Sequence, residues 1–384
     1  MATQSVSLLC PLTMELFRDP VLAQDGHTYE REAIEDWIRK NGTSPKTNQQ
    51  LSLEHLYPNH LVRNLVGAFE TSLIEKNYQF ILNVDVKKKP GRPLFQTFGK
   101  AIYLAEWLPT NSNQPEIIIL KIDGARALKE ASFYVHLTRH PHIVRTFGFV
   151  SDKKTEDENN SVMLLQEYAP EGSLYELLQE RETVPDEKIL IEIFLQIADA
   201  MIFLAYNNIV HGDLACRNVL VFRFDETNIK NNIVKVTDFG LSRESKIYSK
   251  TSGSARTTLD IIPTRYAAPE ILTKNSTPDD YTEKSDVYSM GVLMWEAYAR
   301  GAIPWPKVDK DVDVIQNVTN GILLTRPSKC SSKYWEIITK TWSKLSLDRP
   351  TFKQLKHLLT EQTYITGMYF LRKIQYINHM RSLL

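Results

Sequence analysis

The chain has 384 residues and equal numbers of basic and acidic side chains, 46 of each, so its formal net charge at pH 7 is zero. This balance argues against a nucleic acid or a membrane surface bound by bulk electrostatics. We expect no segment to reach the roughly 18 apolar residues that are needed to span a bilayer, and therefore no membrane insertion. Three cysteines suit a reducing compartment, and the first ten residues lack the pattern of a signal peptide. We therefore expect a cytoplasmic chain of two or three domains.

The first 78 residues are predicted to form one small unit. Asp25-Gly26 is a strong turn signal between two apolar segments and predicts a β-hairpin. An amphipathic helix is expected over about residues 31–40, and a second helix is expected to begin at Asn59, which would cap it. The buried face of this second helix is predicted to carry Leu61, Leu65, Val66, Phe69 and Leu73.

A basic stretch, KKKPGRP at residues 87–93, has the proline and glycine content typical of linkers. We expect a domain over residues 1–78, a linker over 79–93 and a larger domain over 94–362. The tail, residues 363–384, mixes aromatic and basic side chains. A helix packed on the larger domain is favoured there, and a partner-docking segment remains the alternative.

Four short motifs in the first domain occur in a fixed order: CPLTMELFRDPV, DGHTYEREAIEDWI, SPKTN and YPN. Together they resemble the U-box, the metal-free relative of the RING domain in ubiquitin ligases. A separate count supports the metal-free form. The segment has one cysteine and three histidines, whereas two structural zinc ions need about eight ligands, four for each ion. We therefore expect no zinc, and loops held by packing and hydrogen bonds.

The U-box resemblance implies a partner, a ubiquitin-conjugating enzyme charged with ubiquitin, which the domain would orient for transfer. The family's contact positions fall on Leu12, Met14, Trp37, Pro45 and Asn48. Asn48 stands where many relatives carry an arginine that bridges to ubiquitin, and an amide donates fewer, uncharged hydrogen bonds. The alternative for Leu12 and Trp37 is a place in the hydrophobic core.

The larger domain contains three motifs in order: HGDLACRN at residues 211–218, Asp-Phe-Gly at 238–240 and Ala-Pro-Glu at 268–270. A carboxylate, Asp213, is suited to hold a hydroxyl nucleophile. Asn218 and Asp238 are suited to hold magnesium against nucleotide phosphates. Residues 94–362 therefore resemble a protein kinase, and the details resemble the tyrosine kinase branch. The expected fold class is α+β, with a RING-like U-box followed by a two-lobed kinase domain.

The kinase resemblance implies ATP and Mg²⁺ as cofactors and proteins as substrates. Lys121, at the end of the predicted buried strand IIILK, would contact the nucleotide phosphates, and Glu130 in the following helix would pair with it. Asp213 and Arg217 complete the expected catalytic set. The other expected ATP-binding positions are Gly99, Ala101, Ile119, Gln166, Glu167, Ala169 and Leu220.

Two features favour tyrosine as the acceptor, one in the catalytic loop and one just before the Ala-Pro-Glu motif. Ala215 replaces the lysine of serine/threonine kinases, and Arg217 stands where tyrosine kinases place an arginine. Pro263 stands where tyrosine kinases carry a proline that supports the acceptor ring, and Tyr248 is the candidate autophosphorylation site. The resemblance also implies an ion pair between Glu270 and Arg349, and Asp286 as the anchor of the catalytic loop.

Three departures from the kinase pattern stand out. Leu94 and Gln96 occupy the first two glycine positions of the phosphate-covering loop. Ile119 stands where kinases carry a small alanine above the adenine, and Ala101 stands where they carry a valine, so the two side-chain sizes look exchanged. Gly212 replaces the arginine that clamps a phosphorylated activation loop in many kinases.

We expect a bifunctional chain, a ubiquitin ligase and an active kinase. Two alternatives remain open. In one, the kinase-like domain is a nucleotide-binding scaffold or substrate adaptor for the ligase; in the other, the first domain is a non-catalytic interaction module.

Overall fold

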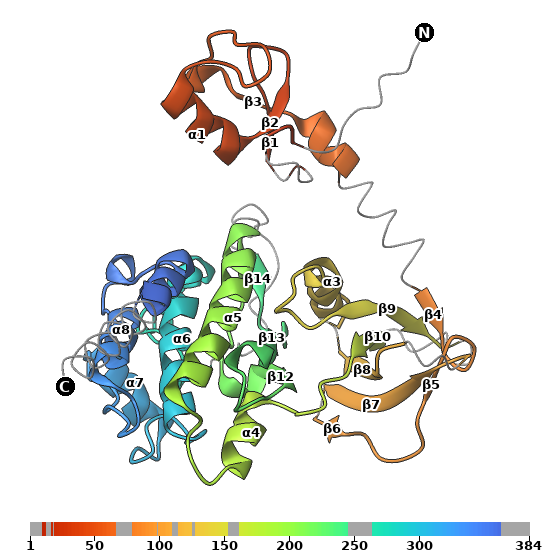
Figure 1. Ribbon diagram of the computed structural model, residues 1–384, viewed down its shortest axis with the longest axis vertical. Helices are drawn as coiled ribbons and strands as arrows, with labels where there is room; N and C mark the ends of the chain where they lie inside the picture. Colours follow the sequence, from red (N-terminus) through yellow and green to blue (C-terminus); the bar gives the residue numbers. More distant parts are fainter. Residues whose placement is uncertain are drawn as a thin grey trace, which may run out of the picture. The chain divides into compact units, whose positions relative to one another are not determined.

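The computed structural model divides into two compact units, Met1–Gln79 and Phe80–Leu384 (Figure 1). The structure describes residues 10–12, 17, 19–66, 79–97, 99–109, 114–124, 127–152, 161–244 and 263–361. Met14, Tyr248 and the tail 363–384 lie outside these described residues. Each unit is treated by itself below.

The first unit is built on a three-stranded antiparallel sheet in the order β2-β1-β3. Its strands are β1 (Pro20–Leu22), β2 (Thr28–Glu30) and β3 (Tyr57–Pro58). The predicted hairpin joins β1 to β2, with Gly26 at a left-handed φ of 76°. The predicted helix is α1 (Arg31–Asn41), which buries Ile34 and Ile38 and ends at Gly42. Both predictions are confirmed.

A second helical segment begins at residue 60. As predicted, Asn59 caps it, because the Asn59 side-chain oxygen accepts a 3.1 Å hydrogen bond from the Val62 amide. The predicted buried face is wrong in part. Val62 and Val66 are buried, one helical turn apart, whereas Leu61 is 68% exposed and Leu65 is also exposed. Phe69 and Leu73 lie outside the described part of the chain.

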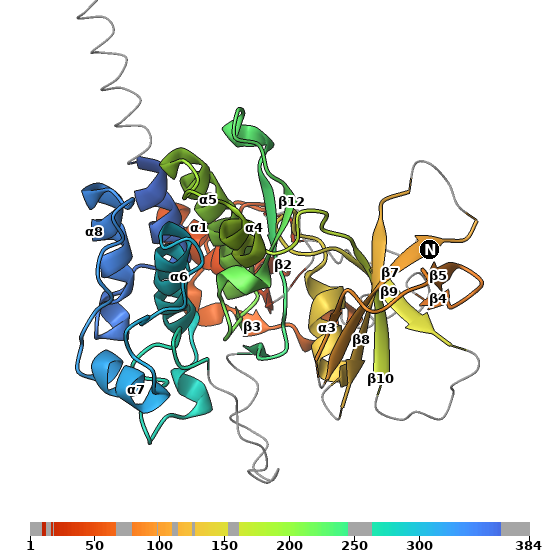
Figure 2. The same ribbon diagram turned by 90° about the horizontal axis from the view of Figure 1, so that it is seen from below.

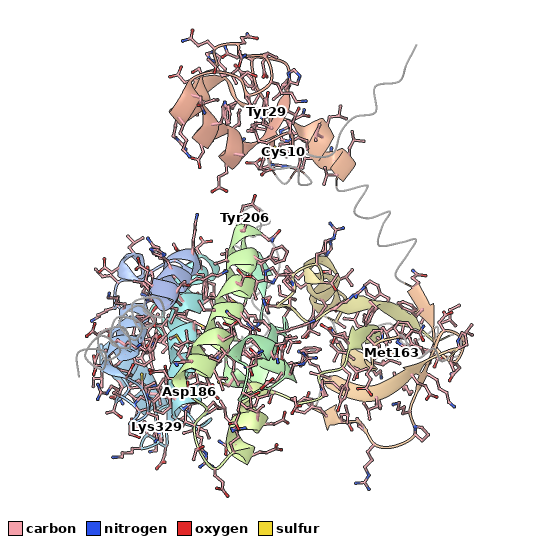
Figure 3. All side chains as sticks on the ribbon, in the orientation of Figure 1. Cys10, Tyr29, Met163, Asp186, Tyr206 and Lys329 are labelled. Carbon is pink, nitrogen blue, oxygen red and sulfur yellow. The ribbon has the colours of Figure 1, made fainter. Side chains whose placement is uncertain are left out.

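A buried carboxylate, Asp25, holds two loops of the first unit together. The hydroxyls of Ser44 and Tyr29 both donate to Asp25 Oδ2, at 2.6 and 2.7 Å. The Ser44 oxygen in turn accepts from the amides of Lys46 and Thr47, at 3.0 and 2.9 Å. Figure 3 labels Tyr29 within this unit. These hydrogen bonds fix the loop after α1 to the hairpin.

A second polar centre lies at the other end of the small sheet. Cys10 Sγ accepts from the amides of Leu12 and Glu30, at 3.4 and 3.2 Å (Cys10 is labelled in Figure 3). The Asp19 carboxylate pairs with Arg31 at 2.6 Å and also with Arg63. Within the described residues of the first unit, no group of three or more His, Cys, Asp or Glu side chains is arranged as a metal site.

The second unit begins with a mainly antiparallel sheet in the order β4-β9-β10-β8-β7-β5, with β6 paired to β7. Figure 2 shows this sheet and the helix α3 at one end of the unit. The strands and the helix are β4 (Gln79–Ile81), β5 (Val86–Lys88), β6 (Phe95–Gln96), β7 (Lys100–Trp107), β8 (Ile117–Asp123), α3 (Ala127–Leu137), β9 (Thr146–Ser151) and β10 (Ser161–Glu167).

The predicted linker over residues 79–93 is therefore wrong, because two strands of this sheet lie within it. Val86 is fully buried and pairs with Trp107, and Phe80 and Leu82 pack against the same core. The Lys88 ammonium lies 4.2 Å from the centre of the Tyr103 ring. The basic composition suggested a linker, but these apolar side chains bury enough surface to order the segment.

The helical half of the second unit surrounds α5 and α6. Its helices are α4 (Leu174–Glu180), α5 (Glu187–Tyr206), α6 (Glu283–Tyr298), α7 (Asp311–Thr319) and α8 (Ser332–Thr341), and residues 352–361 are also helical. Four short strands form two antiparallel pairs: β11 (Ile209–Val210) with β14 (Arg243–Glu244), and β12 (Val219–Arg223) with β13 (Ile233–Val236).

The expectation that no segment is apolar and long enough to span a bilayer is wrong for α5. By length and composition this helix passes that test, alone among the described residues. Most of its apolar stretch is buried inside the helical lobe, as expected of a core helix. Asp186 and Tyr206, labelled in Figure 3, mark its two ends.

Ser44→Ala is expected to loosen the first unit. The substitution removes one of the two hydroxyl donors to the buried Asp25 carboxylate and the acceptor of two loop amides, at a cost of about 1–3 kcal/mol. Hydrogen exchange of the full chain should show faster exchange over residues 19–66 only. Ser52→Ala is the control, since Ser52 accepts only a longer 3.3 Å bond from Glu54 at the surface. Equal exchange in both variants would contradict the role of Ser44.

Candidate active site

The loop that carries Asp213 is held by a buried carboxylate on α6. Asp286 accepts hydrogen bonds from the amides of His211 and Gly212, at 2.7 and 3.0 Å, which confirms the predicted anchor. Burial raises the pKa of Asp286 to about 6, partly offset by these hydrogen bonds and by His211. The His211 ring bridges onward, with Nε2 donating to the Thr237 carbonyl at 3.0 Å and Nδ1 accepting from the Asp213 amide at 3.2 Å.

Gly212, which replaces an arginine of the usual motif, has a left-handed φ of 79°. A Cβ at this position would lie 3.0 Å from the Leu241 carbonyl oxygen. Glycine therefore fits the backbone here without strain, and the chain has no side chain at this position to pair with a phosphate.

Two side chains from the same loop orient Asp213. The Arg217 guanidinium donates to Asp213 Oδ1. The Asn218 amide nitrogen donates to Asp213 Oδ2 at 2.9 Å and to the Asp213 carbonyl at 2.7 Å. The carboxylate raises the pKa of Arg217, although burial opposes this. The predicted catalytic residues Asp213 and Arg217 and the predicted metal ligand Asn218 therefore meet in one place.

Asp238 lies on the opposite side of the site, just after β13, with a φ of 65°. Its Oδ1 accepts from the Gly240 amide at 3.1 Å and from the Lys100 ammonium at 2.6 Å. Although burial opposes it, Lys100 holds the pKa of Asp238 below its usual value. Phe239 is buried against Tyr134 of α3, with ring centroids 5.1 Å apart. This contact joins the Asp-Phe-Gly segment to the sheet half of the unit.

The predicted pair between Lys121 and Glu130 is not the pair in the structure. Glu130 Oε1 lies 2.7 Å from Lys100 Nζ, whereas Lys121 Nζ lies 3.2 Å from Asp123 Oδ1. The two carboxylates raise the pKa of Lys100 against the effect of burial. Burial raises the pKa of Glu130, and the nearby Asp238 charge raises it further. The attraction of Lys100 lowers this pKa but does not fully offset the two effects.

The physical reason is the alternation of side chains along a strand. The Lys100 ammonium contacts Asp238, so the side of β7 that carries Lys100 and Ile102 is directed toward the site. Ala101 pairs with Lys121, and Tyr103 pairs with Ile119, so these side chains belong to the opposite face. Ile119 packs in a core with Val86, Phe80, Trp107 and others on that face. The predicted placement of Ala101 and Ile119 above adenine is therefore corrected, and Ile118 and Leu120 share the face of Lys100.

The remaining predicted nucleotide positions lie around the connection between the lobes. Gln166 is buried on the face of Ile118, its cross-strand partner, and its amide nitrogen donates to Thr146 Oγ1 at 3.0 Å. Glu167 pairs with Lys235 at 2.6 Å. Ala169 is buried, Leu220 of β12 is half-buried, and Gly99 directly precedes Lys100.

The segment that begins at Pro263 is tied to the helical lobe. Arg349, fully buried, makes two hydrogen bonds to the Glu270 carboxylate, both 2.7 Å, which confirms the predicted pair. Pro263 accepts from the Tyr266 amide at 2.8 Å, and the Tyr266 ring lies 5.1 Å from the Arg217 guanidinium. The two positions that suggested a tyrosine acceptor are thus linked through Tyr266.

The residues present fit a magnesium nucleotide. Because the Asn218 amide nitrogen donates to Asp213, the amide oxygen is the atom that would bind a cation. Asp238 uses Oδ1 for Lys100 and Gly240, which leaves Oδ2 for the same cation. Carboxylate and amide oxygens are suitable ligands for Mg²⁺, which usually also binds substrate phosphates.

Three of the predicted partner-binding residues of the first unit, Leu12, Trp37 and Pro45, are half-buried. Leu12 and Trp37 both pack against the core of the unit, and the Trp37 indole donates to the Thr43 carbonyl at 2.9 Å. Pro45 is half-buried. Asn48 is exposed, with a left-handed φ of 59° that asparagine tolerates and arginine rarely adopts. Met14, also predicted here, lies outside the described residues.

Sequence reasoning missed Lys100. One signal was present, since Lys100 directly follows Gly99 of the phosphate-covering loop. The faces of β8 were not a second signal, because the pairing of Gln166 with Ile118, which puts Lys121 on the opposite face, is visible only in the structure.

Comparison with known proteins gives two matches to family models. The model for protein tyrosine and serine/threonine kinases matches residues 97–359, and the U-box domain model matches residues 7–73. Tyrosine-protein kinase csk-1 of Caenorhabditis elegans is 34% identical over 234 residues, which are 61% of this chain and 39% of that protein. Tyrosine-protein kinase Btk of Drosophila melanogaster is 30% identical over 232 residues, 59% of this chain and 26% of that protein.

A third relative is the Ack-related non-receptor tyrosine kinase of Caenorhabditis elegans, 35% identical over 232 residues, 59% of this chain and 20% of that protein. The chain thus spans well under half the length of each of these relatives. The match over residues 97–359 nevertheless covers most of the chain, and the strand-rich and helical lobes agree with it. The chain belongs to the protein tyrosine and serine/threonine kinase family, with a U-box domain ahead of its kinase domain.

Proposed function

We propose that this chain is a bifunctional enzyme, a protein kinase that transfers the γ-phosphate of ATP to tyrosine and a ubiquitin-protein ligase. Its proposed partners are protein substrates and a ubiquitin-conjugating enzyme charged with ubiquitin. The observation that carries the kinase half is the arrangement around Asp213, whose carboxylate is oriented by Arg217 and Asn218. Its three buried free thiols support a cytoplasmic location.

In the proposed reaction, Asp213 accepts a hydrogen bond from the substrate hydroxyl and orients it for attack. Asn218 and Asp238 would hold the magnesium ion, which neutralises phosphate charge when bound. Asp286 accepts hydrogen bonds from the amides of His211 and Gly212 and so holds the loop that carries Asp213 in place, and the base is positioned before substrate arrives. Positioning and charge stabilisation supply most of the catalysis in phosphoryl transfer.

Tyrosine is the proposed acceptor because Arg217, Tyr266 and Pro263 form one contact chain beside Asp213. The three similar proteins reported above are all named as tyrosine kinases, which supports the same acceptor. Tyr248 is proposed as the site of autophosphorylation. Since Gly212 offers no side chain to a phosphate, phosphorylation of Tyr248 is proposed to change activity only modestly.

One observation favours a second candidate function, a ubiquitin ligase whose kinase domain is a nucleotide-binding scaffold or a substrate adaptor. Leu94 is 51% exposed and Gln96 is exposed, at two positions where glycine would let the backbone approach the phosphates. Side chains there limit that approach. A scaffold of this kind binds nucleotide without transferring phosphate.

Asp213→Asn is expected to lower phosphate transfer to a poly-Glu/Tyr acceptor by about 10²-fold or more, because the positioned base is lost. The assay uses the full chain with Mg²⁺ and radiolabelled ATP, and mass spectrometry then identifies the modified residues. Asp313→Asn is the matched control, since Asp313 is exposed on α7. Transfer by Asp213→Asn at the level of Asp313→Asn would refute the kinase proposal, and phosphoserine or phosphothreonine alone would refute the tyrosine acceptor.

Leu12→Ala and Pro45→Ala are each expected to reduce ubiquitin discharge from a charged conjugating enzyme by at least about tenfold, since central apolar contacts carry much of an interface's energy. Leu61→Ala is the control, because Leu61 is an exposed apolar side chain of the same unit that is not among the predicted contacts. Hydrogen exchange over residues 19–66 confirms that each variant stays folded. Discharge unaffected across a panel of conjugating enzymes would favour a non-catalytic interaction module.

A further inference from the structure

We propose that Lys100 on β7, rather than Lys121 on β8, is the lysine that contacts the phosphates of the nucleotide. This inference rests on the proposed use of ATP at this site, and it assigns the phosphate contact to a different strand.

The first argument is the position of the Lys100 ammonium. Its Nζ lies 2.7 Å from Glu130 Oε1 and 2.6 Å from Asp238 Oδ1. Asp238 is the carboxylate suited to hold a cation bound to nucleotide phosphates. An ammonium in contact with that carboxylate lies beside any phosphate that shares the cation, and it supplies a second positive charge there.

The second argument is the space around this ammonium. A Cβ at Gly240 would lie 3.0 Å from Lys100 Nζ, 3.2 Å from Asp238 Oδ1 and 3.2 Å from Glu130 Oε2. The glycine of the Asp-Phe-Gly segment therefore leaves room for three charged groups from α3, β7 and the segment after β13. The charges meet in a place that a larger residue would partly fill.

The third argument is the position of Lys121. Its Nζ lies 3.2 Å from Asp123 Oδ1, and its strand partner Ala101 belongs to the face opposite Lys100. Burial, and then repulsion from Lys121, lowers the pKa of Lys88, whose ammonium stacks on Tyr103 of that same opposite face. Lys121 therefore belongs with Lys88 on the side of the sheet away from Asp238.

An ATP derivative with a reactive acyl group on its terminal phosphate tests the assignment directly. A lysine amine beside the phosphates attacks the acyl carbonyl and forms an amide, and the nucleotide leaves with its phosphates intact. The full chain with Mg²⁺ is treated with this reagent, digested and analysed by mass spectrometry. We expect a label on Lys100 that excess ATP suppresses by at least about tenfold, and no ATP-sensitive label on Lys121.

Two matched variants sharpen the result. Lys100→Arg keeps a positive charge between Glu130 and Asp238, so the fold is retained, yet a guanidinium is not acylated and the ATP-sensitive label should disappear. Lys121→Arg should keep the ATP-sensitive label on Lys100. Thermal melting of both variants checks that they remain folded.

An ATP-sensitive label on Lys121 and not on Lys100 would overturn the inference, as would ATP-insensitive labelling of both lysines. The readout does not require phosphate transfer. An ATP-protected Lys100 in a protein that fails to phosphorylate poly-Glu/Tyr would support the inference while refuting the kinase activity in the proposed function.

Discussion

The Lys100 ammonium lies between two carboxylates that come from different parts of the kinase domain. Glu130 belongs to α3 of the strand-rich lobe, and Asp238 belongs to the segment that leads into the helical lobe. Because like charges repel in a partly buried site, the carboxylates can share this space only with a cation between them. The positions of α3, of the Asp-Phe-Gly segment and of the start of β7 therefore depend on one another. The contact of Phe239 with Tyr134 adds an apolar link across the same boundary.

The loops of the U-box are also held by polar contacts to charged or polarisable side chains. Its loops are short of regular hydrogen bonding, and two polar centres, around Asp25 and around Asp19 with Cys10, supply acceptors for them. Each centre gathers donors from segments well separated along the chain. Hydrogen bonds to a charged group are stronger than those between neutral groups, so a carboxylate is an effective acceptor in this role.

Much of the site was predictable because its residues lie in short motifs of fixed geometry. Asp213, Arg217 and Asn218 are within six residues of one another, and the loop conformation brings them together. The Glu270–Arg349 pair and the Asp286 anchor followed from the resemblance of their motifs to those of protein kinases. The hairpin and α1 followed from Asp25-Gly26 and from one apolar stripe. These features depend on local chemistry that the sequence displays directly.

Two of the errors arise where apolar residues occupy both faces of a strand or helix, so that the sequence does not show which face is buried or which face meets the site. Residues 117–120 are Ile, Ile, Ile and Leu, and all four are buried, so no alternation reveals which face meets the nucleotide. A shift of one residue moved Lys121, Ile119 and Ala101 to the wrong face. Similarly, the valines at 62 and 66 and the leucines at 61 and 65 are all apolar, and only the packing distinguishes buried from exposed. The strand at Val86–Lys88 was missed for another reason, because the basic residues after Val86 suggested a solvated linker.

The place of Lys100 in the chain also has a mechanical consequence. It is the first residue of β7, directly after Gly99 at the turn from β6, so the ammonium and the covering turn share one backbone. A displacement of that turn would therefore also move the backbone that carries the ammonium lying between Glu130 and Asp238. A lysine in the middle of an inner strand would not be tied to the turn in this way.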